Sequence, residues 1–303
     1  MPTQDARIGQ AEDYMGYKIS EIWDALDPKI TIPNWMELVS DYGKHNEAAR
    51  RHNPPKTFRY ADHDRGELDL YAQGVPNGAP ALVMFHGGGF SLLSKEDMAF
   101  AAPTFNAAGI AYISVGYPLA PGARFSELLA ATQNAAKWIY ENAQELGIDR
   151  ERIYVTGGSA GAYISAYLLT TDWRDFGLPR SIFAGGMLLN GVFDATPLYL
   201  SEGWDYLGIK EEEVEALSPI SRTDDLVDPI LLARGEDEPP LTHLANEQLA
   251  AAAAERGLLV ESYVDRGSNH FSMILALMDR QSNLFRKMED MIAGGTEGTA
   301  AVA

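Results

Sequence analysis

The pattern of hydrophobic and polar positions divides the chain into a helical N-terminal part and a longer part in which strands alternate with helices. Apolar side chains recur at helical spacing between Ile19 and Leu26 and again between Trp35 and Tyr42. We predict two short amphipathic helices here, broken at Asp27-Pro28 and Ile32-Pro33. Such a segment either covers an active-site mouth or packs on the edge of a sheet.

Strand patterns begin near residue 56. Lys56–Tyr60 and Glu67–Tyr71 flank a polar turn and predict a hairpin. Strands are then predicted at Ala81–Phe85, Ala111–Val115, Ile153–Thr156, Phe183–Leu189, Pro229–Ala233 and Leu259–Val264, and helices at Phe125–Leu146, Ala160–Leu169 and Leu241–Arg256. Because the two types alternate, we expect right-handed crossovers and a mostly parallel sheet with helices on both faces.

One predicted strand runs into a turn of small residues that carries a serine. The residues read Gly157-x-Ser159-x-Gly161 and lead into an Ala-rich helix, which is the spacing of a nucleophile elbow. Glycine is needed there because a side chain would collide with neighbouring backbone in the tight turn. Taken alone, the motif is equally compatible with a glycine-rich turn that holds a passive serine.

A second glycine-rich loop follows the strand that ends at Phe85. It reads His86-Gly87-Gly88-Gly89-Phe90, and a triple glycine lets backbone amides approach a ligand, as an oxyanion hole requires. A phosphate-binding loop is the alternative, but neither GK[ST] nor GxGxxG spacing follows. His86 precedes the amide donors, so we interpret it as a residue that anchors the loop rather than as a catalytic base.

Polar residues that suit catalysis follow two later strands. The acidic cluster Glu236-Asp237-Glu238 comes after Pro229–Ala233, and His270 comes after Leu259–Val264. Active sites of such sheets form beyond the carboxyl ends of the strands, so we expect both to lie near Ser159. The chain order of serine, acid and histidine is that of α/β hydrolases, and it predicts a catalytic triad.

Several blocks also resemble known families. His86–Phe90, Tyr117-Pro118-Leu119-Ala120-Pro121 and Gly157–Gly161 resemble the HGGG, Y-x-LAP and G-x-SAG blocks of α/β-hydrolase esterases of the hormone-sensitive-lipase type. Residues 190–194, 217–219, 235–239 and 269–271 are similar to the kynurenine formamidase (arylformamidase) branch. The resemblance covers roughly residues 40–285. Gly158 departs from it, because formamidases usually carry His there and the lipase-type esterases Asp.

The resemblance implies a fold and a division of the chain. The expected fold is the α/β-hydrolase fold, a mostly parallel twisted sheet with helices on both faces and a small N-terminal helical cap. The expected parts are a helical cap segment at 1–51, the α/β-hydrolase domain at 52–292 and a disordered Gly/Thr/Ala-rich tail at 293–303.

The site residues take their expected roles from the same resemblance and from residue chemistry. Ser159 would attack a carbonyl while His270 takes its proton, and an acid would hold the imidazole. The amides of Gly88, Gly89 and Ala160 would bind the oxyanion. No metal and no organic cofactor is expected.

Two adjacent carboxylates compete for the role of the acid. In the related families the acid stands three residues after the position of Gly235, which selects Glu238. Pro239-Pro240 restricts the backbone of Glu238 to extended conformations, which suits a side chain at a strand end. Asp237 remains the alternative.

The predicted function is hydrolysis of a carboxylic ester of a small to medium substrate through an acyl-enzyme. The runner-up is an arylformamidase or amidase acting on an N-formyl aryl amine such as N-formylkynurenine. A third class, a non-catalytic hydrolase-fold protein that binds a ligand, stays open.

The composition of the chain indicates which classes of partner and which cellular compartment to expect. Acidic residues outnumber basic ones 43 to 24, a net charge of −19, which argues against nucleic acid or anionic membrane as a partner. The chain has no cysteine, so disulfides and thiolate zinc sites are excluded. His63 stands between two aspartates, but a solvated turn is favoured over a metal site.

Residues 1–10 lack the apolar region of a secretory signal peptide. We expect a soluble, cytoplasmic protein that acts on a small-molecule ester or amide; a homodimer stays open.

Overall fold

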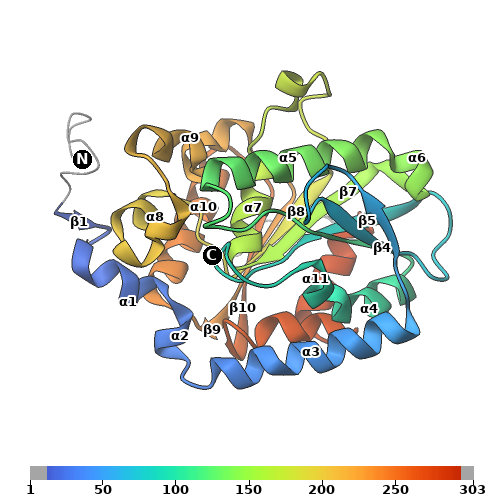
Figure 1. Ribbon diagram of the computed structural model, residues 1–303, viewed down its shortest axis with the longest axis horizontal. Helices are drawn as coiled ribbons and strands as arrows, with labels where there is room; N and C mark the ends of the chain where they lie inside the picture. The colour runs from blue at the N-terminus through green and yellow to red at the C-terminus, as the bar shows by residue number, and fades with distance from the viewer. Residues whose placement is uncertain (1–11, 295–303) are drawn as a thin grey trace.

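Eight strands form one sheet in the order β10-β9-β8-β7-β5-β6-β4-β3. A computed structural model describes residues 12–294 (Figure 1). The strands are β3 Lys56–Arg59, β4 Glu67–Tyr71, β5 Ala79–Phe85, β6 Ala111–Val115, β7 Ile148–Gly158, β8 Gly185–Leu189, β9 Ile230–Asp237 and β10 Val260–Asn269. All pairs from β10 to β6 are parallel, whereas β4 pairs antiparallel with β6 and with β3. The mostly parallel sheet and the hairpin predicted from the sequence are therefore confirmed.

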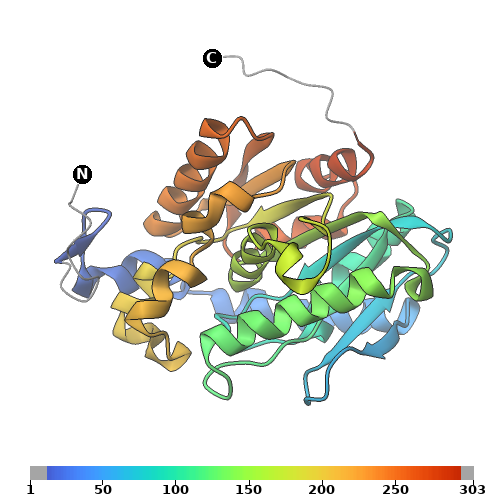
Figure 2. The ribbon, with the colours of Figure 1, turned by 90° about the horizontal axis from the view of Figure 1, so that it is seen from above.

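Helices cover both faces of the sheet (Figure 2). The longer helices are α3 Trp35–His52, α4 Ala102–Ala107, α5 Phe125–Glu141, α7 Ala160–Leu169, α10 Pro240–Glu255 and α11 Asn283–Ile292. Side chains of β5 alternate between the layers, because Val83 and Phe85 join the cluster with α5, α7 and α10, while Leu82 and Met84 join the cluster with α3, α4 and α11. This alternation explains why β5 is apolar throughout.

Some predicted boundaries differ from the observed ones. The helix predicted at 125–146 is two helices, α5 and α6 Ala143–Leu146, because Asn142 leaves the helical conformation and its side chain bonds to the carbonyl of Trp138. The 3₁₀ segment η3 Lys95–Ala101 and the helices α4 and α11 were not predicted. Short helices between β8 and β9 also add to the prediction: α8 Thr196–Leu200, η5 Glu202–Leu207, α9 Val214–Leu217 and η7 Pro219–Asp225.

The N-terminal segment forms two short helices and then a long helix that packs on the sheet. After a two-stranded pair, β1 Asp13–Tyr14 and β2 Tyr17–Lys18, it forms α1 Ile22–Leu26 and α2 Pro28–Thr31. The predicted break at Asp27-Pro28 is confirmed, and the Asp27 side chain caps α2. The following helix α3 lies along one face of the sheet, where Arg50 donates to the buried carboxylate of Asp69 at 2.6 Å. The proposed tail at 293–303 lies almost wholly outside the described residues.

Candidate active site

Ser159 stands in a sharp turn between β7 and α7. Its backbone has φ 56° and ψ −120°, a conformation that costs energy for any residue other than glycine. A Cβ at Gly157 would lie 2.3 Å from the carbonyl carbon of Gly161, and one at Gly161 would lie 2.0 Å from the carbonyl oxygen of Phe85. Only glycine therefore allows β5, β7 and α7 to approach closely enough to form this turn.

The glycine loop after β5 packs directly against the serine turn. A Cβ at Gly87 would lie 2.8 Å from the carbonyl oxygen of Gly158. Gly88 has φ 96°, and a Cβ there would lie 2.4 Å from the carbonyl oxygen of Leu92. The Tyr206 hydroxyl donates to the carbonyl oxygen of Gly89 at 2.8 Å, and burial raises the pKa of Tyr206 to about 12, so the hydroxyl stays protonated. The loop is thus held both by the elbow and by η5.

His86 lies beneath this loop and not in the cavity. Its ring stacks on Tyr117 with centroids 4.1 Å apart, and the Tyr117 hydroxyl donates to the His86 carbonyl at 2.6 Å. Complete burial lowers the pKa of His86 to about 3, so the imidazole is neutral at ordinary pH. These contacts agree with the anchoring role expected from the sequence.

His270 and Glu238 form a buried pair at the ends of β10 and β9. The Nδ1 atom of His270 lies 2.6 Å from Oε2 of Glu238. Because an ionised carboxylate only accepts, Nδ1 carries the proton and Nε2 is left as the basic nitrogen. The Glu238 side chain is fully buried, whereas Asp237 is exposed and pairs in register with Asn269. Of the two adjacent carboxylates, the structure brings Glu238 to the histidine.

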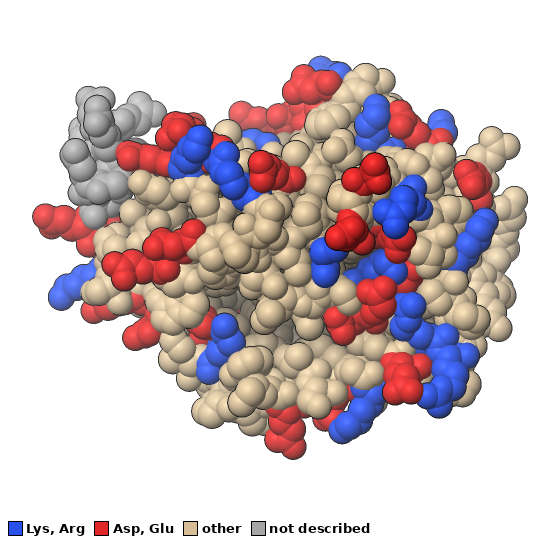
Figure 3. All heavy atoms as spheres, viewed as in Figure 1, with Lys and Arg blue, Asp and Glu red and all other residues tan. Residues whose placement is uncertain are grey.

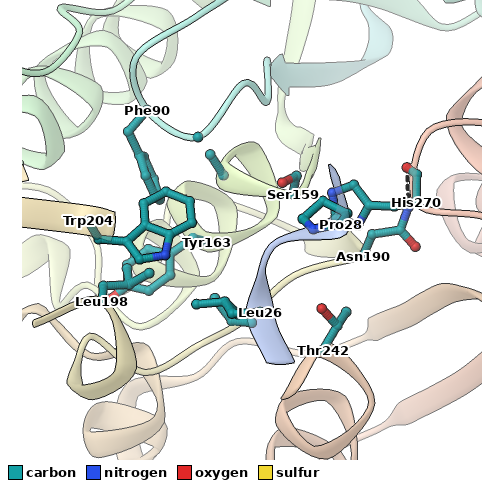
Figure 4. Close-up of a pocket in the computed structure, with 13 residues that line it drawn as sticks. Leu26, Pro28, Phe90, Ser159, Tyr163, Asn190, Leu198, Trp204, Thr242 and His270 are labelled. Atoms are coloured by element: carbon teal, nitrogen blue, oxygen red, sulfur yellow. Dashed lines mark hydrogen bonds between the residues drawn. The ribbon is translucent and has the colours of Figure 1, made fainter. Parts of the chain in front are cut away.

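Asn190 joins the strand ends to the histidine loop, a contact that the sequence analysis missed. Its side-chain amide donates to the carbonyl of His270 at 3.0 Å, the dashed bond of Figure 4, and its Oδ1 accepts from the amide of Gly235 at 3.0 Å. The residue has φ 54°, a left-handed conformation that Asn tolerates better than most residues. An Asn directly after the apolar run of β8 is the sequence signal for it.

Two cavities meet at Ser159 and His270. The smaller has a volume of about 40 Å³ and the larger about 220 Å³. Figure 4 shows Ser159 and His270 on one side of the smaller cavity, opposite Phe90 and Trp204. Among the described residues, the Nδ1 atom of His270 is bonded to Glu238 and no hydrogen bond joins its ring to Ser159. Such catalytic bonds often form only around a substrate.

The larger cavity has aromatic walls built from distant parts of the sequence. Trp23 of α1 packs against Trp204 of η5 with ring centroids 5.6 Å apart, and Trp35 of α3 stacks on Phe271 at 6.2 Å. The Trp23 ring occupies the space that a Cβ at Gly203 would need. The N-terminal segment therefore supplies part of the wall of the site.

The described residues, 12–294, contain neither a cluster of metal ligands nor a helix that could cross a membrane. In that range no three His, Asp or Glu side chains are grouped so as to hold a metal ion. Within the same range, none of the helices combines the length and the apolar character needed to cross a bilayer.

The chain is similar to known hydrolases in sequence. A family model described as alpha/beta hydrolase fold matches residues 82–217. A kynurenine formamidase of Salmo salar is 24% identical over 240 residues, 77% of this chain and 80% of that protein. A carboxylesterase of Mycobacterium tuberculosis is 40% identical over 111 residues, 36% of this chain and 34% of that protein.

Solved structures of other proteins share the fold over most of this chain. A putative thioesterase from Silicibacter sp. superimposes with a TM-score of 0.75 at 22% identity, covering 88% of this chain and 98% of that one. An esterase of Pyrobaculum calidifontis gives a TM-score of 0.64 at 22% identity, covering 90% of this chain and 93% of that one.

Proposed function

We propose that this chain, which has the α/β-hydrolase fold, is a serine hydrolase that cleaves a carboxylic ester of a small to medium substrate through an acyl-enzyme. The observation that carries the proposal is the arrangement of three side chains. Ser159 in its strained turn and His270, which is bound to buried Glu238, line the same two cavities. A nucleophile, a base and an orienting carboxylate in this arrangement are typical of acyl transfer.

In the proposed first step, Ser159 Oγ attacks the carbonyl carbon and its proton passes to Nε2 of His270. Glu238 stabilises the imidazolium that forms. The carbonyl oxygen becomes an oxyanion and accepts bonds from the amides of Gly88, Gly89 and Ala160, each worth about 3 kcal/mol in comparable sites. The bond to the leaving oxygen then breaks and His270 returns the proton to that oxygen.

In the second step a water molecule releases the acyl group. His270 takes a proton from the water, the hydroxide attacks the acyl carbon, and Ser159 leaves with the proton that His270 gives back. The acid leaves as product and the enzyme is restored. This chemistry needs only side chains and backbone amides of the chain itself.

Arylformamidase activity is the second candidate, and cavity size is the observation that favours it. The smaller cavity, at about 40 Å³, has less than a fifth of the volume of the larger one, at about 220 Å³. A cavity this small suits a short acyl group such as formyl or acetyl. The same residues would act, but the leaving amine would need protonation by His270.

A substrate panel separates the two candidates. Among the esters, we expect kcat/KM to be highest for acetyl and to fall from propionyl onward, because longer acyl chains exceed the smaller cavity. N-formylkynurenine is measured beside them. A kcat/KM for N-formylkynurenine above that of every ester would replace the first candidate with the second.

We expect Tyr206→Phe to lower kcat about tenfold while KM changes little, because phenylalanine keeps the ring that lines the larger cavity and removes only the bond that orients the glycine loop. The matched control is Tyr60→Phe, which removes a bond of 2.7 Å to the carbonyl of Gly116 outside both cavities. Equal losses in the two variants, or a loss confined to KM, would show that Tyr206 has no special role in positioning the loop.

We further propose that the N-terminal segment acts as a cap through α1 and α2. Trp23→Ala should change the ratio of kcat/KM between bulky and small esters by about tenfold, since it opens one wall of the larger cavity. Substitution is preferable to truncation because Ile22 and Leu26 are part of the core. Trp138→Ala, which removes a ring packed on Phe58 away from the site, is the control. An unchanged ratio in Trp23→Ala would leave the segment with a packing role alone.

A further inference from the structure

We propose that Lys29 makes the larger cavity selective for substrates whose bulky part carries a carboxylate beside an aromatic ring. The proposal rests on the hydrolase function proposed above, and it adds a recognition residue to that site. Lys29 belongs to α2, lines the larger cavity and has a side chain that is 43% exposed, so its ammonium is accessible from the cavity and from solvent.

Two indole rings lie near this ammonium. The Nζ atom lies 5.8 Å from the ring centroid of Trp23 and 5.9 Å from that of Trp35. Both distances are within the range in which a cation is attracted to an aromatic face. The rings therefore hold a positive charge at the aromatic wall, where a flexible lysine would otherwise extend into solvent.

Asp27 also contacts this lysine. Its Oδ2 lies 3.4 Å from Nζ, while its Oδ1 accepts the backbone amide of Lys29 at 2.9 Å and so caps α2. An ammonium has three donors, and one weak contact with Asp27 leaves capacity for a second carboxylate. Asp27 is almost completely buried, which leaves Lys29 as the more accessible partner of the pair.

The charge of the surroundings makes this lysine unusual. The chain has a net charge of −19, yet among the described residues Lys29 is the one lysine or arginine that lines the larger cavity. In Figure 3 a hollow opens near the centre of the face, and basic side-chain atoms lie at its edge over α2. Asp27 of the same wall offsets part of this charge, but Lys29 is the lysine or arginine toward which a carboxylate in the cavity is attracted.

The competing explanation is that Lys29 only neutralises Asp27. Measurements of ligand binding distinguish this explanation from the recognition of a substrate carboxylate. Titration of tryptophan fluorescence compares 3-phenylpropionate with its neutral amide, 3-phenylpropanamide. We expect the wild-type protein to bind the carboxylate at least tenfold more tightly. Lys29→Gln should abolish the preference and Lys29→Arg should retain most of it. Lys44→Gln removes the same charge from an exposed pair on α3 and should leave the preference unchanged.

Hydrolysis provides the second readout. The substrates are phenyl acetate and 4-(2-carboxyethyl)phenyl acetate, and the quantity compared is the ratio of their kcat/KM values. Lys29→Gln should lower the carboxylate-to-neutral ratio about tenfold, and Asp27→Asn, which keeps a capping side chain but removes the competing charge, should raise it.

The outcomes distinguish the inference from the proposed function. A wild-type protein without preference for 3-phenylpropionate, or a preference that survives in Lys29→Gln, overturns the inference even if both esters are hydrolysed. A preference that depends on Lys29 supports it, even if neither ester is hydrolysed and the proposed function fails. Thermal denaturation of each variant confirms that it is folded.

Discussion

Ser159→Ala is expected to lower kcat by roughly 10⁴ or more while the protein remains folded, because the hydroxyl oxygen is the proposed nucleophile and alanine has none. Alanine keeps the Cβ, so the strained backbone at φ 56° and the two neighbouring glycine contacts stay as they are. Residual turnover would come from the amides and from binding alone.

The matched control is a serine of α7, the helix that follows Ser159. Ser165 is buried in α7 and donates to the carbonyl of Gly161 at 2.8 Å, so Ser165→Ala removes a hydroxyl one turn away from the cavity. We expect that variant to retain most activity and to lose some thermal stability. If Ser159→Ala kept even a tenth of wild-type kcat, Ser159 would have no place in the mechanism.

The second large effect concerns the acid. Glu238→Gln should lower kcat by roughly 10⁴, because an amide at this place can donate to Nδ1 and so stabilise the tautomer that leaves Nε2 protonated. Asp237→Asn should stay within a few-fold of wild type, since Asp237 is exposed and does not contact the histidine.

Kinetics and denaturation of both variants decide between the two carboxylates. The pair is well matched, because each substitution replaces one carboxylate with its isosteric amide on adjacent residues. A large loss in Asp237→Asn together with near-normal turnover in Glu238→Gln would reverse the assignment.

The strands and the mostly parallel sheet followed from local pattern to a large extent. The α/β-hydrolase fold predicted from the sequence is confirmed. Ala111–Val115 and Ala160–Leu169 match β6 and α7 to the residue, because both are fully buried and their apolar runs end sharply. The break at Asn142 was missed because a single Asn within an amphipathic run is compatible with a continuous helix. The helix α11 could have been predicted, since Leu284, Met288 and Met291 lie on one face.

Candidate site residues could be predicted from the sequence where a reactive side chain directly follows a strand. They could not be predicted where segments distant in the sequence come into contact. Ser159 and His270 each follow a strand, so the parallel sheet brings them to one edge. The contact of Trp23 with Trp204 joins residues that lie far apart in the sequence, and no local pattern encodes it. The same holds for Asn190, whose bonds depend on three strand ends meeting.

Reaction with a fluorophosphonate tests the central proposal most directly. The reagent forms a bond from Ser159 Oγ to phosphorus as fluoride leaves, and the proton passes to His270. Mass spectrometry of the intact, folded protein should show one added group, and peptide mapping should place it on Ser159, with no addition in Ser159→Ala. Addition at another residue would contradict Ser159 as the nucleophile. No addition in a folded wild-type sample would contradict a serine hydrolase and favour a protein that binds its ligand without cleaving it.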